Sequence, residues 1–144
     1  RQMCIRGRRN DGDAVAYRLL AGKPVIGAGD GNAPWTLTRS EDFAKPFVNL
    51  FANPHALYED FHITGDKGFT WDAIYTAIGR GLGVDTKIAH VASDTLCQYN
   101  PDWKGPLLGD KSWTALFDNS KVKRVAGAFT CETDLDKILE QSIK

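Results

Sequence analysis

Apolar residues recur at helical spacing along much of the chain. Positions three and four residues apart predict helices over 14–21, 41–51, 71–82, 93–99, 120–126 and 134–144. Ser40, Thr70 and Asp118 precede three of these runs and are expected to cap their N-termini, because short polar side chains accept hydrogen bonds from the first turn. Gly22 and Gly83 follow two others and are expected to end them.

Short runs of apolar or alternating residues predict strands between the helices, over 24–28, 35–39, 61–64, 87–91 and 113–117. The sequence Gly29-Asp30-Gly31-Asn32 is typical of a turn, and we expect it to join the first two strands as a hairpin. The order strand 61–64, helix 71–82, strand 87–91 predicts a parallel crossover. An α/β layer is the simplest architecture that contains these elements.

Composition excludes few functions. The chain has 144 residues, and its 18 lysines and arginines balance 18 aspartates and glutamates. A net charge of zero argues against a dedicated nucleic-acid binder or a binder of anionic membranes. No apolar run is long enough to predict a membrane span. Four basic residues lie near the N-terminus: Arg1, Arg6, Arg8 and Arg9. Because chain ends are usually solvated, we favour a solvated end over a phosphate-binding arm.

The cysteines and histidines do not form a recognisable metal or disulfide motif. Three widely spaced cysteines without a Cys-x-x-Cys pair are typical of reduced thiols in a cytoplasmic protein. His55, His62 and His90 are too far apart for a helical metal pair, so we expect them to pack or to form hydrogen bonds. We predict no metal site.

Two segments carry a resemblance to a known family. Gly29-Asp30-Gly31 is followed, thirteen positions after Gly29, by Asp42-Phe43-Ala44. A second segment matches at Phe61, Ile63, Gly65, Asp66, Thr70, Trp71, Ile74, Tyr75, Leu82 and Gly83. The order resembles extended short-chain dehydrogenase/reductases of the NAD-dependent epimerase/dehydratase type, and residues 117–127 resemble the segment near the C-terminus of that family.

The resemblance implies a Rossmann-like α/β fold. This chain, 1–144, would be a single domain or fragment that forms the C-terminal substrate-binding portion, without the N-terminal dinucleotide-binding strands. Its partners would be the missing N-terminal Rossmann half and a small-molecule substrate, with a second copy of the chain as a further candidate. We expect the whole protein to be cytoplasmic, with no membrane partner and no nucleic acid.

The catalytic and cofactor motifs of that family are missing. None of the tyrosines is followed four residues later by lysine, so the Tyr-x-x-x-Lys pair is absent. In Gly27-x-Gly29-x-Gly31, Asn32 takes the place of the third glycine of the dinucleotide fingerprint, and no helix is expected directly after it. We therefore expect NAD or NADP in the full-length parent, no cofactor on the isolated chain, and no catalytic residue within it.

The family also suggests where a substrate would bind. Its two diphosphate-binding arginines are replaced here by Trp35 and, counting back from Gly109-Asp110, by Leu107. Arg39 is the nearest candidate for a compensating cation, although a plain surface role is equally open. Trp35, Arg39, Leu107 and Asp110 are therefore the candidate substrate-binding residues.

These observations predict the substrate-binding portion of an enzyme that oxidises, reduces, epimerises or dehydrates a small polar organic molecule. The loss of both arginines argues against a nucleoside-diphosphate sugar. The alternative is a non-catalytic nucleotide- or RNA-binding module of the same fold.

Overall fold

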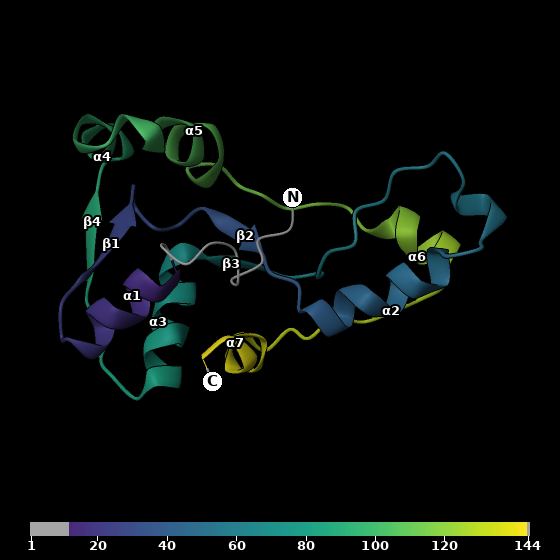
Figure 1. Cartoon of the computed structure of the whole chain (residues 1–144), viewed down its shortest axis with the longest axis horizontal. Coiled ribbons are helices and arrows are strands. Elements are labelled where there is room, and N and C mark those ends of the chain that lie inside the picture. The colour runs from purple at the N-terminus through teal and green to yellow at the C-terminus, as the bar shows by residue number, and fades with distance from the viewer. Residues whose placement is uncertain (1–11, 144) are drawn as a thin grey trace.

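The computed structural model describes residues 12–143, so the N-terminal arginines lie outside the described residues. The elements, in chain order, are α1 (Gly12–Leu20), β1 (Val25–Ala28), β2 (Pro34–Thr36), α2 (Ser40–Leu50), η1 (Pro54–Ala56), β3 (Gly68–Thr70), α3 (Trp71–Leu82), β4 (Ile88–Val91), α4 (Ser93–Tyr99), η2 (Pro101–Trp103), α5 (Lys104–Pro106), η3 (Leu107–Lys111), α6 (Ser120–Ala126) and α7 (Leu135–Ile143). Figure 1 shows α1, α3 and the β1–β4 pair at one end, and α2 with α6 at the other.

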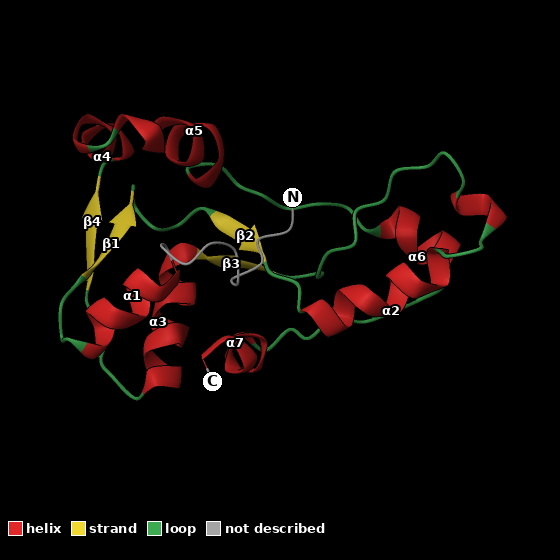
Figure 2. Cartoon of the chain, in the orientation of Figure 1, coloured by secondary structure: helices red, strands yellow, loops and turns green. Residues whose placement is uncertain are grey.

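The strands form two separate two-stranded sheets (Figure 2). β1 and β4 run parallel, with Val25 opposite Ile88 and Ala28 opposite Val91. β2 and β3 run antiparallel, with Trp35 opposite Phe69. The hairpin expectation is therefore wrong. The turn 29–32 carries the chain from one sheet to the other, because the backbone of β1 is paired with β4 and not with β2.

The predicted parallel pairing exists, but with a different partner strand. Residues 61–64 form no strand in the structure, and β4 pairs with β1 instead. The segment is held by its side chains: Ile63 is buried and packs with Val122 and Ala126 of α6. The pattern of residues 61–64 suits an extended backbone, but pairing needs a neighbouring strand, which the fold places elsewhere.

Most of the predicted helices are confirmed, and α3 most closely. Thr70 caps it, accepting a hydrogen bond at its Oγ1 from the Ala73 N–H at 3.2 Å. Gly83 ends it with φ of +71°, a left-handed conformation that glycine adopts without strain. Along the part of the chain that the structure describes, no helix is both long and apolar enough to cross a membrane.

The main core lies where α3 and α7 pack against the β2–β3 sheet. Its buried side chains come from all four elements and from the residue after β2: Trp35, Leu37, Phe69, Ile74, Ala77, Ile138 and Leu139. The apolar stripe predicted for 71–82 and that predicted for 134–144 both face this core.

Helix α2 starts one residue earlier than expected. It begins at Ser40, with Arg39 in the N-cap position and no side chain capping it. Asp42 and Pro46 are its buried residues. Its apolar side is only partly covered: Phe43 and Leu50 pack against the cluster that contains Val122 of α6, whereas Phe51 is 67% exposed.

The stretch before α6 also departs from the sequence pattern. Residues 101–111, for which no helix was predicted, form the short helical turns η2, α5 and η3. The strand expected over 113–117 is reduced to a single parallel bridge between Ala115 and Trp35. Glycine and proline suggested loop here, but both residues are compatible with short helical turns.

A buried carboxylate fastens α2 to the C-terminal segment. Asp42, 4% exposed, accepts a hydrogen bond from the Glu132 N–H at 3.0 Å and one from Lys45 Nζ at 3.1 Å. Burial raises the pKa of Asp42, but these hydrogen bonds outweigh it, so the net pKa lies below the ordinary value.

We predict that Asp42→Asn makes the protein less stable near neutral pH and less sensitive to acid. Because the folded-state pKa of Asp42 is lowered, its contribution is complete above the unfolded-state pKa of about 4 and is lost as pH falls through the folded pKa. Urea unfolding at neutral pH and near pH 3 should show the gap between wild type and variant shrinking in acid. The exposed Asp85→Asn is the control, and a gap of equal size at both pH values would contradict the prediction.

Candidate functional site

A pocket of about 310 Å³ lies where three segments distant in sequence meet. β2 forms one wall, residues 61–64 a second and residues 115–117 a third. The Thr36 N–H donates to the Ala115 carbonyl at 3.2 Å, and the Ala115 N–H donates to the Pro34 carbonyl at 2.9 Å. The Gly65 N–H donates to Thr38 Oγ1 at 2.9 Å. The pocket walls are therefore hydrogen-bonded to one another.

The lining combines aromatic rings with hydroxyl groups. It consists of Trp35, Thr36, Thr38, Phe43, Phe61, His62, Ile63, Thr64, Ala115 and Phe117. No lysine, arginine, aspartate or glutamate is among them, so His62 is the one titratable side chain that residues 12–143 contribute to the lining. Such a surface resembles ordinary small-molecule pockets, which are mostly apolar with a few placed polar groups.

Some polar atoms of the lining residues have no hydrogen-bond partner. Trp35 Nε1 and Thr64 Oγ1 are buried and have no hydrogen-bond partner among the described residues. Thr36 Oγ1 donates to the Ala115 carbonyl at 3.1 Å, and Thr38 Oγ1 accepts from Gly65. Buried polar atoms are usually paired, so two unpaired atoms in the side chains that line one pocket are notable.

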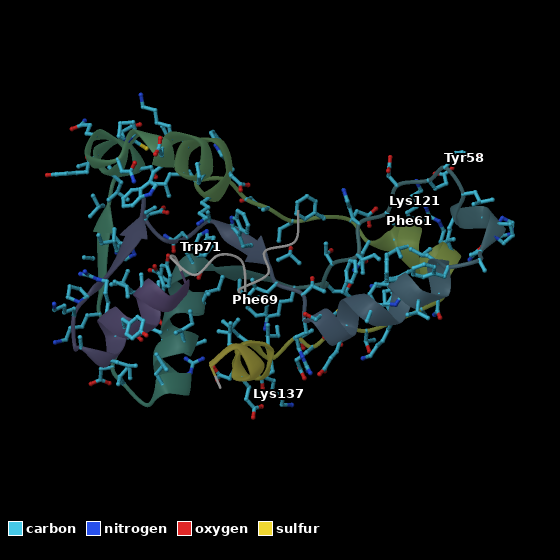
Figure 3. All side chains as sticks on the ribbon, viewed as in Figure 1. Tyr58, Phe61, Phe69, Trp71, Lys121 and Lys137 are labelled. Atoms are coloured by element: carbon cyan, nitrogen blue, oxygen red, sulfur yellow. The ribbon has the colours of Figure 1, made fainter. Side chains whose placement is uncertain are left out.

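The cations near the pocket are already engaged. Lys121 Nζ lies 5.2 Å from the centre of the Phe61 ring and 2.6 Å from Glu59 Oε2. Figure 3 shows Lys121 beside Phe61, close to α6. Arg39 forms an ion pair with Glu41 through its Nη2, while its buried Nε has no hydrogen-bond partner among the described residues. Neither cation lines the pocket.

The four residues predicted to bind substrate are not all brought together. Trp35 is buried in β2 and lines the pocket. Arg39 stands at the start of α2, outside the lining. Leu107 and Asp110 lie on η3, and neither lines the pocket. The connection between η3 and the pocket is indirect: Lys111 Nζ lies 5.6 Å from the Trp71 ring centre, and Trp71 lies 5.2 Å from Trp35.

Sequence reasoning missed most of the pocket lining. His62 was expected to pack, and its ring does meet Phe117 edge to face at 5.0 Å, but it also lines the pocket. Phe61, Thr64 and Phe117 carried no functional expectation. Phe61 and Phe117 belong to segments that resemble the family, which was the available signal. No local pattern indicates that residues 61–64 and 115–117 meet.

The contact between His90 and Asp72 explains why residue 31 is a glycine. His90 Nε2 lies 2.9 and 3.0 Å from the two carboxylate oxygens of Asp72, which confirms the hydrogen-bonding role expected for His90. A Cβ on Gly31 would lie 1.9 Å from Asp72 Oδ1 and 2.8 Å from His90 Nε2. Glycine is therefore required at position 31 by the close approach of this pair.

We predict that Gly31→Ala destabilises the protein much more than Gly29→Ala. Both glycines have positive φ, of +71° and +69°, so each substitution carries a backbone cost of about 1–2 kcal/mol. A Cβ at position 29 meets open space, whereas one at 31 displaces the Asp72 carboxylate. Urea unfolding of the two variants measures the difference, and equal losses would show that the Asp72–His90 contact is unimportant.

The cysteine nearest the pocket is poorly suited to nucleophilic chemistry. Cys131 Sγ lies 3.8 Å from the Thr64 carbonyl oxygen. Burial, with the nearby carboxylates of Asp42 and Asp66, raises the pKa of its thiol to about 11. Among residues 12–143, no group of three or more His, Cys, Asp or Glu side chains could hold a metal ion.

Known proteins resemble this chain over most of its length. No protein-family model matches it. The 2'-dehydrokanamycin reductase of Streptomyces kanamyceticus is 26% identical over 120 residues, which are 83% of this chain and 33% of that protein. The chloroplast stem-loop binding protein of 41 kDa b of Arabidopsis thaliana is 31% identical over 86 residues, 59% of this chain and 21% of that protein.

The decisive comparison is structural. The UDP-glucuronic acid 4-epimerase of Bacillus cereus, in complex with UDP-glucuronic acid and NAD, matches 88% of this chain with a TM-score of 0.66 and 19% identity. The match covers 36% of the epimerase and falls in its C-terminal portion. This chain has the fold of the C-terminal portion of a Rossmann-like epimerase.

The epimerase-like fold confirms the fold class expected from the sequence and the resemblance stated there. The chain spans about a third or less of the length of the relatives that it matches. In the solved epimerase structures the matched part is the C-terminal portion.

Proposed function

We propose that this chain is the substrate-binding portion of an NAD- or NADP-dependent protein that epimerises, dehydrates or reduces a small polar organic molecule. The observation that carries the proposal is the match of nearly the whole chain to the C-terminal portion of an epimerase whose complex holds NAD and a sugar nucleotide. Since one fold hosts several chemistries, the fold by itself does not choose between these reactions.

The β1–β4 pair supports a partner that completes the sheet. Parallel sheets occur almost only where both faces are covered and further strands are paired. Within residues 12–143, β1 and β4 pair only with each other, and Ile26 in β1 is 46% exposed. A preceding Rossmann half would supply the missing strands and cover this surface.

The pocket favours a substrate other than a nucleoside-diphosphate sugar. A diphosphate needs cations, and arginine suits its oxygens because a planar guanidinium can bind two of them at once. Trp35 and Leu107 stand where the family has those arginines. Arg39, the candidate replacement, already pairs with Glu41.

The residues of this chain do not fit the phosphates of a dinucleotide. The loop 29–33 leads into β2 and not into a helix. The helix N-terminus that lies against it, that of α3, donates its Asp72 N–H to the Gly31 carbonyl and presents the Asp72 carboxylate, which would repel a phosphate. Gly31 within the loop is packed against Asp72 and His90. NAD or NADP would therefore be held by the preceding half, where it would supply the hydride chemistry, and this chain would bind and orient the substrate.

We predict that the isolated chain has no hydride-transfer activity. Absorbance at the NADH band should stay constant when the chain is mixed with NAD or NADP and candidate hydroxylated substrates, because neither the Tyr-x-x-x-Lys pair nor a dinucleotide loop is present. Turnover by this chain alone would overturn the proposal. The coding DNA upstream of Arg1 provides a second test: it should encode a glycine-rich loop and a Tyr-x-x-x-Lys motif.

The alternative, a non-catalytic nucleotide- or RNA-binding module, has one supporting observation, the 31% identity to a stem-loop binding protein. Under this alternative, RNA binding would weaken steeply with salt and would be lost on replacing Arg6, Arg8 and Arg9, since such binding depends on phosphate contacts. We expect no salt-dependent binding in a gel-shift titration with a short stem-loop RNA. Replacement of the exposed Lys104 is the control for a general loss of charge.

A further inference from the structure

The pocket described above has room for one small ring. Its volume of about 310 Å³ is at the lower end of the range usual for ligand sites. The rings of Trp35, Phe61 and Phe117 contribute to its walls and offer apolar surface to a flat ligand face. A sugar nucleotide with its diphosphate would extend beyond this space.

Three threonine hydroxyls in the lining differ in the hydrogen bonds that they still offer. Thr36 Oγ1 donates to Ala115, so its lone pairs remain free to accept. Thr38 Oγ1 accepts from Gly65, so its proton remains free to donate. Thr64 Oγ1 is buried and has no partner among the described residues, so it can donate or accept once a small shift of the wall uncovers it. Together they suit a ligand whose groups both donate and accept, as hydroxyls do.

The charge of the lining, like its size and its hydroxyl groups, limits which ligands fit the pocket. Among the described residues, no acidic or basic side chain other than His62 lines the pocket, and the nearby Lys121 is paired with Glu59. A charged ligand would lose its hydration there without gaining a counter-ion. A neutral ligand avoids that cost.

We propose that this pocket binds a neutral, hydroxylated six-membered ring, of the pyranose or cyclitol class. One face of the ring lies against the aromatic wall, and its hydroxyls exchange hydrogen bonds with Thr36, Thr38 and Thr64. The unpartnered indole N–H of Trp35 donates to a ligand oxygen after a small adjustment of the wall that covers it. This proposal adds a ligand class to the proposed function. It rests on the proposed function only where the ligand is taken to be the substrate.

Nuclear magnetic resonance of the 144-residue chain, without any nicotinamide cofactor, tests the proposal. The probes are methyl α-D-glucopyranoside and myo-inositol, with UDP and uridine for comparison. We expect the indole N–H resonance of Trp35, assigned with Trp35→Phe, to shift with the neutral rings at millimolar concentrations. The resonance of Trp113, which is 66% exposed and outside the pocket, should not move.

A matched pair of variants links binding to the pocket. Thr64→Val removes the unpartnered hydroxyl at nearly constant shape and should weaken binding about threefold to tenfold. Thr64→Ser should restore most of it, and Thr95→Val, the same change at an exposed position of α4, should have no effect. Urea unfolding verifies that each variant is folded.

Three results would overturn the inference: no shift of the Trp35 resonance with either neutral ring, tighter binding of UDP or uridine, or equal binding by wild type and Thr64→Val. Because no cofactor is used, these results are independent of the proposed function. Hydride transfer by the isolated chain would refute the proposed function and leave the binding result intact. A failure to bind neutral rings would leave the epimerase-like assignment standing.

Discussion

Burial of Trp35 is the contact on which the rest of the structure depends. This side chain, 8% exposed, lies in β2 opposite Phe69 of β3 and packs with α3 and α7 in the main core. Its backbone also bridges to Ala115, which brings in a segment eighty residues further along. An aromatic side chain of this size removes much apolar surface from water, so one residue can stabilise the meeting of four elements.

The same residue links the core to the pocket. Trp35 lines it, and the two segments that complete it are held against β2 by backbone hydrogen bonds and by Thr38. A pocket formed on this scaffold is largely fixed before any ligand arrives. That rigidity favours recognition by shape and by a few placed hydroxyls over recognition by mobile charged side chains.

Ion pairs and hydrogen bonds engage several charged groups near the pocket. Lys121 pairs with Glu59, and Arg39 pairs with Glu41. Asp42 accepts a hydrogen bond from the Glu132 backbone and so holds α2 to the C-terminal segment. The fold locates the site, and the side chains that line it decide what can bind there.

Local sequence signals determined the helices, since capping and apolar spacing act within a few residues: Thr70 and Gly83 delimit α3 without help from the rest of the chain. They also located β1 and β4. Tertiary structure alone decided which strands pair, that residues 61–64 remain extended without a partner strand, and that α2 buries Asp42 while Phe51, just after it, stays exposed. The pocket belongs to this second group. Trp35 could be singled out from the sequence, but Phe61, Thr64 and Phe117 join it only through contacts between distant segments, which no local pattern encodes.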